Sequence, residues 1–309
     1  MLHVIAVLSN PVQYKRRYEL HNDFCQRMKQ YPEINLITVE LQQKNRPFVT
    51  DATIKLRTNH ELWYKENLIN YAVQTHLPED WEYMAWIDSD IDFENPHWVK
   101  DTVERLQTYK VVQLFTHAID LGPNQETLDV HTGFAYQFVN GETYHSKNYG
   151  KFWHPGYAWA ITKEAYNQIG GLIDFAILGS ADNHMAMAFI GQVEKSFNSK
   201  LHPNYKQMCM NFQKRCEIHI QHDIGFIHGT IKHYWHGDKN NRKYQERWQI
   251  MVRHQFDPLF DIKKDCKNLW QLETNKPNLR NDLRSYFRGR NEDAVIVHQN
   301  YRYVKSNWW

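Results

Sequence analysis

Two aspartates one residue apart, Asp88 and Asp90, follow directly on an apolar run of the chain. Residues Met84 to Ile87 carry no charge and are mostly large, which is typical of a strand covered on both faces. The two carboxylates would then lie at the carboxyl end of that strand, at the edge of an open α/β sheet where ligands bind. Mg²⁺ and Mn²⁺ take oxygen ligands and commonly bind one or two carboxylates together with substrate phosphates. The spacing therefore predicts a divalent metal site for a phosphorylated ligand, the plain alternative being a strand that ends in an acidic turn.

A second group of candidates lies late in the chain. His228, His233 and His236 stand beside glycine and tryptophan residues, and basic residues follow them at positions 239, 242 and 247. Imidazole is an acceptable Mn²⁺ ligand, and the basic side chains could neutralise a diphosphate. A single histidine is more often structural, but three beside a basic run favour a metal and phosphate site. Neither the H-E-x-x-H pattern nor a Cys/His zinc spacing is present to indicate a hydrolytic zinc centre.

A third candidate, Asp182, opens an expected helix. Before it, the aromatic run from Trp153 to Ile161 predicts a strand, Thr162 an N-cap and Gly170 with Gly171 the end of a short helix. An aspartate in this place can act as a general base. It can also serve only as a helix N-cap.

These motifs, taken together, carry a resemblance. Asp88-Ser89-Asp90 after a hydrophobic strand resembles the Asp-x-Asp motif of GT-A fold glycosyltransferases, which hold a nucleotide sugar through a divalent metal. The stretch from Trp153 to Leu172 is similar to the galactosyltransferase C-terminal region that frames the donor sugar. The resemblance covers about residues 1–240. It implies an α/β fold with a Rossmann-like mixed sheet flanked by helices, a nucleoside-diphosphate sugar donor (UDP-sugar first), Mn²⁺ or Mg²⁺, and hexosyl or pentosyl transfer to an acceptor hydroxyl.

The resemblance also implies a role for individual residues. Asp182 would be the base of an inverting transfer, although this chain has Ala181-Asp182 where the family often has two acidic residues; in a retaining enzyme Asp182 would instead orient a substrate. The metal ligands would be Asp88, Asp90 and His236. The donor contacts would come from Asn10, Arg16 with Arg17 beside it, Arg57, Lys65, Gly156, Trp159, His233, Lys239 and Arg242. The acceptor contacts would come from His154, Asn183 and His184.

The expected elements give the order of the fold. Strands are predicted over 2–8, 34–41, 84–87, 111–115 and 153–161, and helices over 14–31, 61–72, 93–106, 162–169 and 182–188. Residues 44–58 are polar and irregular, and residues 116–151 form a long, weakly patterned segment suited to acceptor-side loops. We expect a transferase domain over 1–250, with a nucleotide-binding half over 1–115 and an acceptor-side half over 116–250. A helical, arginine-rich extension follows over 251–309.

Composition narrows the class of protein. The 309 residues are 42% hydrophobic and 23% charged, which fits a folded globular protein. A net charge of +2 argues against a protein that mainly coats a polyanion. The four cysteines are too few for a disulfide framework, and no stretch is long enough for a membrane span. We therefore expect a soluble cytoplasmic protein, bacterial or viral in style, in the latter case in the host cytoplasm.

Alternatives remain open at this stage. A sugar- or nucleotide-binding module without catalysis, or a nucleotidyltransferase, would use the same metal and phosphate groups. The absence of a G-x-G-x-x-G or P-loop pattern disfavours dinucleotide oxidoreductases and P-loop kinases. The acceptor is a glycan or, as a second choice, a hydroxylated nucleic-acid base. That second choice would use the stripe of Arg280, Arg284 and Arg288, which is otherwise a solvated face or an interdomain contact.

Overall fold

The computed structural model describes residues 1–144, 153–244, 246–273 and 276–294. Its centre is a mixed sheet, for which the described residues supply seven strands. Their order is β11 (Ile224–Phe226), β6 (Val111–Gln113), β10 (Ala158–Thr162), β4 (Tyr83–Ile87), β1 (Leu2–Ser9), β2 (Ile34–Gln43) and β3 (Ile54–Thr58). Strands β3, β2, β1 and β4 are parallel, whereas β10 runs antiparallel between β4 and β6. The prediction of a mixed α/β sheet flanked by helices is confirmed.

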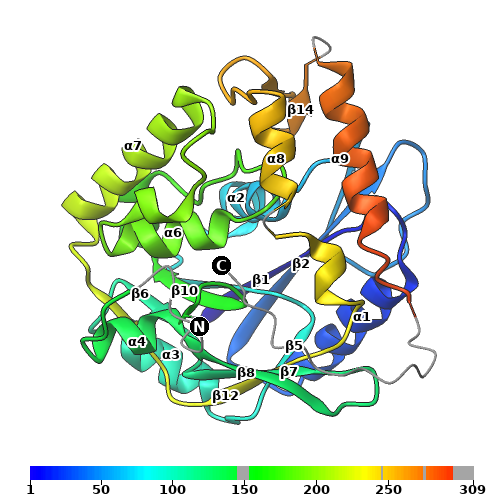
Figure 1. Ribbon diagram of the computed structural model, residues 1–309. Coiled ribbons are helices and arrows are strands. Elements are labelled where there is room, and N and C mark those ends of the chain that lie inside the picture. The colour runs from blue at the N-terminus through cyan, green and yellow to red at the C-terminus, as the bar shows by residue number, and fades with distance from the viewer. Residues whose placement is uncertain (145–152, 245, 274–275, 295–309) are drawn as a thin grey trace.

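Each face of this sheet is covered by helices (Figure 1). The helices α1 (Lys15–Met28) and α3 (Trp98–Leu106) pack on one face, where Phe24 and Trp98 are fully buried against alternate residues of β1 and β4. The helices α2 (Lys65–His76), α5 (Lys163–Ile169), α6 (Ala181–Phe189) and α7 (Pro203–His219) pack on the other face. Because side chains alternate along a strand, both cores take residues from the same strands. The order β3-β2-β1-β4 has a switch point between β1 and β4, and ligands bind outside the carboxyl ends of strands at such a point.

A second, five-stranded sheet lies beside the carboxyl end of β4 among the described residues. Its order is β5 (Ile91–Phe93), β12 (Thr230–His233), β7 (His117–Leu121), β8 (Thr127–Gly133) and β9 (Trp153–His154). The first of these strands begins directly after Asp90, so the end of the central sheet and the start of the second meet at the Asp-x-Asp motif. Residues 117–139, expected to be weakly patterned, instead form β7, β8 and the short helix α4 (Phe134–Val139).

The described residues from 246 to 294 form two helices and a hairpin. The helix α8 (Glu246–Arg253) is followed by β13 (Ile262–Lys264) paired with β14 (Trp270–Leu272), and then by α9 (Pro277–Gly289). Buried Leu279, Leu283 and Phe287 attach α9 to the same core as α2. In the described part of the chain, no helix is long and apolar enough to cross a membrane.

Candidate functional site

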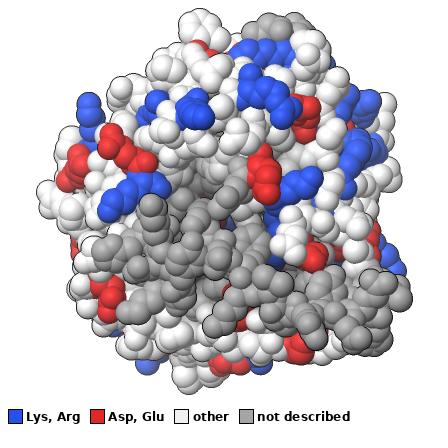
Figure 2. Space-filling view, viewed as in Figure 1, with Lys and Arg blue, Asp and Glu red and all other residues white. Residues whose placement is uncertain are grey.

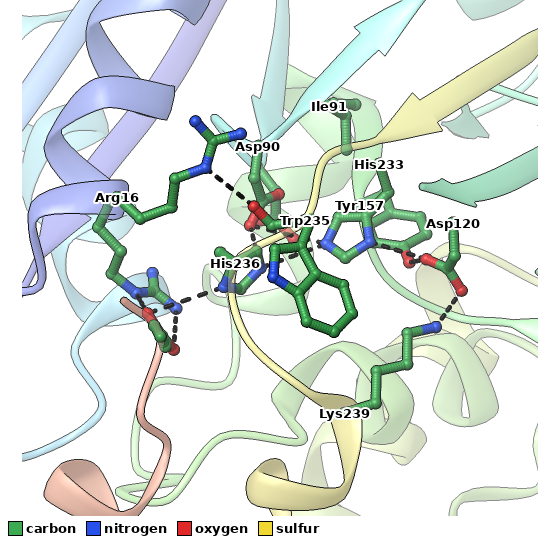
Figure 3. A network of polar contacts seen from close by, with 12 residues as sticks. Arg16, Asp90, Ile91, Asp120, Tyr157, His233, Trp235, His236 and Lys239 are labelled. Atoms are coloured by element: carbon green, nitrogen blue, oxygen red, sulfur yellow. Dashed lines mark hydrogen bonds and ion pairs between the residues drawn. The ribbon is translucent and has the colours of Figure 1, made fainter. Parts of the chain in front are cut away.

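The side chains of Asp90, His233 and His236 come together where the two sheets meet (Figure 3). The Nε2 atom of His236 lies 2.9 Å from Oδ2 of Asp90 and 3.3 Å from Nε2 of His233. One ligand atom from each of the three residues falls within 4.8 Å of the other two. His233 ends strand β12 and Asp90 follows β4, so two sheets fix the group.

Hydrogen bonding determines what the histidines present to this centre. Nδ1 of His233 lies 2.7 Å from Oδ1 of Asp120, and Tyr157 donates to the same carboxylate oxygen at 2.9 Å. Burial would raise the pKa of Asp120, but hydrogen bonds from His131 and His233 outweigh it and hold the pKa well below its usual range. Because an ionised carboxylate only accepts, His233 donates through Nδ1. Burial lowers the pKa of His233, which leaves a neutral ring whose Nε2 carries a lone pair.

Nε2 of His236 faces the same centre. Arg242, which can only donate, lies with Nη2 2.7 Å from this nitrogen, and the Asp90 carboxylate, which accepts, lies 2.9 Å from it. Burial would raise the pKa of Asp90, but His233, His236 and Arg17 outweigh it and keep this carboxylate ionised, and its Oδ1 is buried with no hydrogen-bond partner among the described residues. Two imidazole nitrogens and a carboxylate oxygen therefore face one another. This donor set fits a divalent cation such as Mn²⁺.

Asp88 lies beside this group but has a different partner. It forms an ion pair with Lys65, the first residue of α2. Burial and repulsion from Asp90 raise the pKa of Asp88, while the Lys65 ammonium opposes both. The structure thus pairs Asp88 with Lys65 and places Asp90, not Asp88, next to the histidines.

Asp182 lies in the first turn of α6. Its charge contributes to the pKa shifts of Lys65 and Asp88, so the three groups lie within electrostatic range. The backbone N–H of Asn183 donates to Oδ1 of Asp182 at 2.8 Å and orients the carboxylate. A Cβ atom at Gly156 would lie 2.7 Å from the Oδ2 of Asp182, so this carboxylate occupies space that only a glycine at 156 leaves free.

The other predicted donor contacts divide into two groups. Lys239 and Arg242 lie in the site, Lys239 against Asp120 and Arg242 against His236. Four others hold backbone elsewhere: Asn10 bonds the backbone of Tyr14, Arg16 the carbonyl of Trp235, Arg57 the carbonyls of Lys44 and Arg46, and Trp159 the carbonyl of Pro155. Their polar groups are thereby engaged in supporting loops around the site.

The predicted acceptor contacts also differ from one another. His154 stacks on Tyr157 with ring centroids 3.8 Å apart, next to Gly156. His184 is fully buried, and its ring nitrogens lie 2.7 Å from the Ser196 hydroxyl and 3.0 Å from the Tyr205 hydroxyl. Because both nitrogens already have partners in the core, this placement argues against the predicted acceptor contact of His184.

The arginine stripe on α9 is partly neutralised within the chain. Figure 2 shows Lys and Arg side chains gathered on the upper right of this face, over α9. On α9, Arg284 and Arg288 form ion pairs with Glu61, at 3.4 and 2.8 Å. This contact fits the interdomain alternative better than a surface reserved for a polyanion.

Sequence patterns did not reveal three residues of the site, namely Asp120, Glu66 and Glu292. Asp120 lies in the segment expected to be loops. The one available signal was its two-residue spacing from Ala118, which places both side chains on the same face of a strand. Glu66, in the first turn of α2, is 4% exposed, and burial raises its pKa to about 8 although Lys65 opposes the shift. Glu292 comes from the far end of the chain.

The raised pKa of Glu66 predicts a pH-dependent stability. Between its ordinary pKa near 4.5 and about 8, the folded state binds a proton that the unfolded state has lost. The free energy of unfolding should therefore fall as pH rises through this range, by up to about 1.4 kcal/mol per pH unit. Glu66→Gln should remove that decline and be more stable than the wild type above pH 8, with no difference below pH 4.5. Urea unfolding at several pH values measures it, with Glu104→Gln, on an exposed face of α3, as control.

Comparisons with known proteins add structural similarities only. No protein-family model matches the sequence, and no curated protein matches it. The structure is similar to the catalytic domain of Drosophila beta-1,4-galactosyltransferase 7 in complex with xylobiose, with 11% identity, a TM-score of 0.41, and coverage of 90% of this chain and 96% of that chain. A mutant of the same enzyme in complex with manganese, UDP-Gal and xylobiose gives 10% identity, a TM-score of 0.41, and coverage of 90% and 97%.

A third solved structure shows a more distant similarity. The 4-diphosphocytidyl-2C-methyl-D-erythritol synthase of Anaerococcus prevotii gives 11% identity, a TM-score of 0.30, and coverage of 82% of this chain and 97% of that chain. Sequence identities this low say nothing about the chemistry of the site, which has to be inferred from its own geometry.

Proposed function

We propose that this protein is a metal-dependent glycosyltransferase of the GT-A type, which moves a sugar from a nucleoside-diphosphate sugar to an acceptor hydroxyl. The observation that carries the proposal is the meeting of Asp90, His233 and His236 after the carboxyl end of β4, with Asp182 within electrostatic range of neighbouring Asp88. The first group suits a divalent cation and the second suits proton transfer. A crevice at the β1–β4 switch point is where an open α/β sheet binds such a ligand.

The chain's own residues supply most of the chemistry. Asp182 takes the proton of the acceptor hydroxyl as that oxygen forms a bond to the anomeric carbon of the donor. The bond from this carbon to the diphosphate breaks, and the nucleoside diphosphate leaves with the bonding electron pair. Arg242 and Lys239 offset the charge that develops on it, because guanidinium and ammonium groups stabilise phosphate oxygens. When bound by Asp90, His233 and His236, the cation would add Lewis-acid stabilisation of the same leaving group.

Asp88 and Lys65 would act as a pair in this crevice. In the structure the ammonium of Lys65 contacts Asp88 and lies within electrostatic range of Asp182. A donor diphosphate would compete for Lys65, which would free Asp88 to act as a further oxygen ligand or to bind the donor. We keep UDP-sugars as the first donors to test and Mn²⁺ ahead of Mg²⁺, because two of the three ligands are imidazoles.

A donor screen tests the proposal directly. Nucleotide sugars with UDP, GDP, CDP and ADP carriers are added to the purified protein with and without Mn²⁺, and the unfolding temperature and the slow hydrolysis of each donor are measured. We expect one carrier to raise the unfolding temperature only when Mn²⁺ is present, since a ligand stabilises the state that binds it. Release of pyrophosphate from a nucleoside triphosphate and a sugar phosphate would instead show a nucleotidyltransferase. Binding without turnover on any acceptor would show a binding module.

The space beside Gly156 gives a more selective prediction. In Gly156→Ala the new methyl group would push the end of the Asp182 side chain away, since their separation would be 2.7 Å. Only the tip of a side chain must move, so we expect a stable protein whose transfer rate falls by about 10²-fold, comparable to loss of general-base catalysis. Mn²⁺ affinity should be unchanged. Gly289→Ala, where no atom lies within 4 Å of the added Cβ, is the matched control and should be fully active.

A further inference from the structure

The segment Arg290–Asp293, which we call the C-terminal strap, lies directly against the candidate metal centre. Gly237, the residue after His236, has a φ of +89° and closely faces the strap backbone. A Cβ atom there would lie 2.9 Å from Cα of Glu292 and 3.0 Å from the carbonyl oxygen of Asn291. The chain therefore has a glycine at the point where the backbone after His236 contacts the backbone of the C-terminal strap.

The strap is also fastened to the start of α1. The carboxylate of Asp293 accepts hydrogen bonds from the backbone N–H groups of Lys15 and Arg16, at 2.9 and 2.8 Å. Asn291 donates its backbone N–H to the hydroxyl of Tyr14 at 2.9 Å. A carboxylate on the free N–H groups of a helix start is favourable because both the hydrogen bonds and the helix dipole support it. These contacts hold the strap against the start of α1.

Glu292 of the strap reaches the metal centre itself. It is 3% exposed, and Arg17 and Arg290 bind its carboxylate, with Nη2 of Arg17 3.0 Å and Nε of Arg290 2.5 Å from Oε1. Burial would raise the pKa of Glu292, but the two guanidinium groups outweigh it and keep the carboxylate ionised. Its Oε2 lies 3.7 Å from Nδ1 of His236.

Nδ1 of His236 has no hydrogen-bond acceptor among the described residues. When Nε2 of His236, the atom that faces Asp90, binds the cation, the proton of the imidazole is on Nδ1. Nδ1 is buried with no hydrogen-bond partner among the described residues, which is costly for an N–H group. The ionised Glu292 is the carboxylate that faces it. Asp120 faces Nδ1 of His233 in a similar way but at hydrogen-bonding distance, 2.7 Å against 3.7 Å, as seen right of centre in Figure 3.

We propose that Glu292 is a positioning residue of the metal centre, which holds the proton of His236 on Nδ1 and so presents the Nε2 lone pair to the cation. The two histidine ligands would then each be oriented by a carboxylate, Asp120 for one and Glu292 for the other. Such outer partners fix the tautomer and the orientation of a ligating histidine. This inference rests on the proposed function, and it makes the C-terminal strap part of the site and not an appendage.

Titration with Mn²⁺ alone tests the proposal on the full chain. Loss of an outer carboxylate typically weakens metal binding by about 10- to 100-fold, and we expect Glu292→Gln to show a loss of this size by electron paramagnetic resonance of the free ion. Glu273→Gln, in an ion pair with Lys263 on the hairpin, is the matched control and should bind as the wild type does. Equal affinity in Glu292→Gln and the wild type overturns the inference alone. A wild type that binds no Mn²⁺ overturns the proposed function and this inference with it.

A second readout separates positioning from mere support of the fold. Long-range ¹H–¹⁵N spectra of the imidazoles, recorded without metal, report which ring nitrogen carries the proton. We expect His236 to be an Nδ1–H tautomer in the wild type and to lose that preference in Glu292→Gln, while His233 keeps its own. If the Gln variant does not fold, Glu292→Asp is used instead. It keeps the negative charge but moves the carboxylate one methylene further from His236. Unchanged tautomers, or tighter binding of a nucleoside diphosphate to the variant, would show that Glu292 only fills an anion site, and would overturn the proposal.

Discussion

Replacing Asp90 by asparagine should abolish metal-dependent turnover of the donor, with a fall in rate of at least about 10³-fold. The ionised carboxylate is the one anionic ligand among Asp90, His233 and His236, and its Oδ1 is held without a hydrogen-bond partner among the described residues. An amide keeps the shape but removes the charge. A bound metal stabilises the transition state by several kcal/mol. Since about 1.4 kcal/mol of this stabilisation corresponds to a tenfold change in rate, its loss accounts for a fall of this size.

The control for this variant lies two residues further on. Asp92→Asn changes an aspartate of the same acidic run, but its side chain pairs with Arg27 at 3.2 Å and meets the Tyr234 hydroxyl at 3.3 Å, outside the metal group. We expect it to bind Mn²⁺ and turn over the donor within a few-fold of the wild type. Donor hydrolysis and Mn²⁺ titration should be measured on both variants. Full Mn²⁺ affinity in Asp90→Asn would show that the cation, if any, lies elsewhere.

The local patterns of the sequence were sufficient for the main parts of the fold. Thr162 caps α5 by accepting from the N–H of Ala165, and Gly170 ends it with a φ of +79°, as the turn and cap residues indicated. Strand β3, by contrast, lay in a stretch expected to be irregular, although its burial alternates strictly from Ile54 to Thr58. The alternation of Ile54, Lys55, Leu56, Arg57 and Thr58 is visible in the sequence, but it is only five residues long and follows a polar stretch.

The contacts that complete the site could not be predicted in the same way. Asp120 and His233 are 113 positions apart, and Arg17 and Glu292 are 275 positions apart. Local periodicity says nothing about such pairs, because only the packing of the second sheet and the path of the C-terminal strap bring them together. The sequence also gave no reason to separate Asp88 from Asp90. The difference arises from Lys65, which reaches Asp88 from the start of α2.

Asp182→Asn is expected to leave binding intact and to remove catalysis. If Asp182 takes the proton of the acceptor hydroxyl, its amide cannot do so, and general-base catalysis contributes about 10²- to 10⁴-fold. The transfer rate should fall by that factor at saturating donor and acceptor. The affinity for Mn²⁺ should stay as in the wild type, because Asp182 is not among the residues that form the metal group.

The start of another helix provides the control for this loss. Asp182 lies in the first turn of α6, where any acid also stabilises the helix, so Glu164→Gln in the first turn of α5 measures that effect alone. We expect this control to keep its transfer rate, because Glu164 is exposed and, within the part of the chain that the structure describes, bonds only to Gln168 of its own helix. A transfer rate in Asp182→Asn within a few-fold of the wild type would remove Asp182 as the base. If Mn²⁺ binding fell together with the rate, Asp182 would act on the metal centre and not on the acceptor proton.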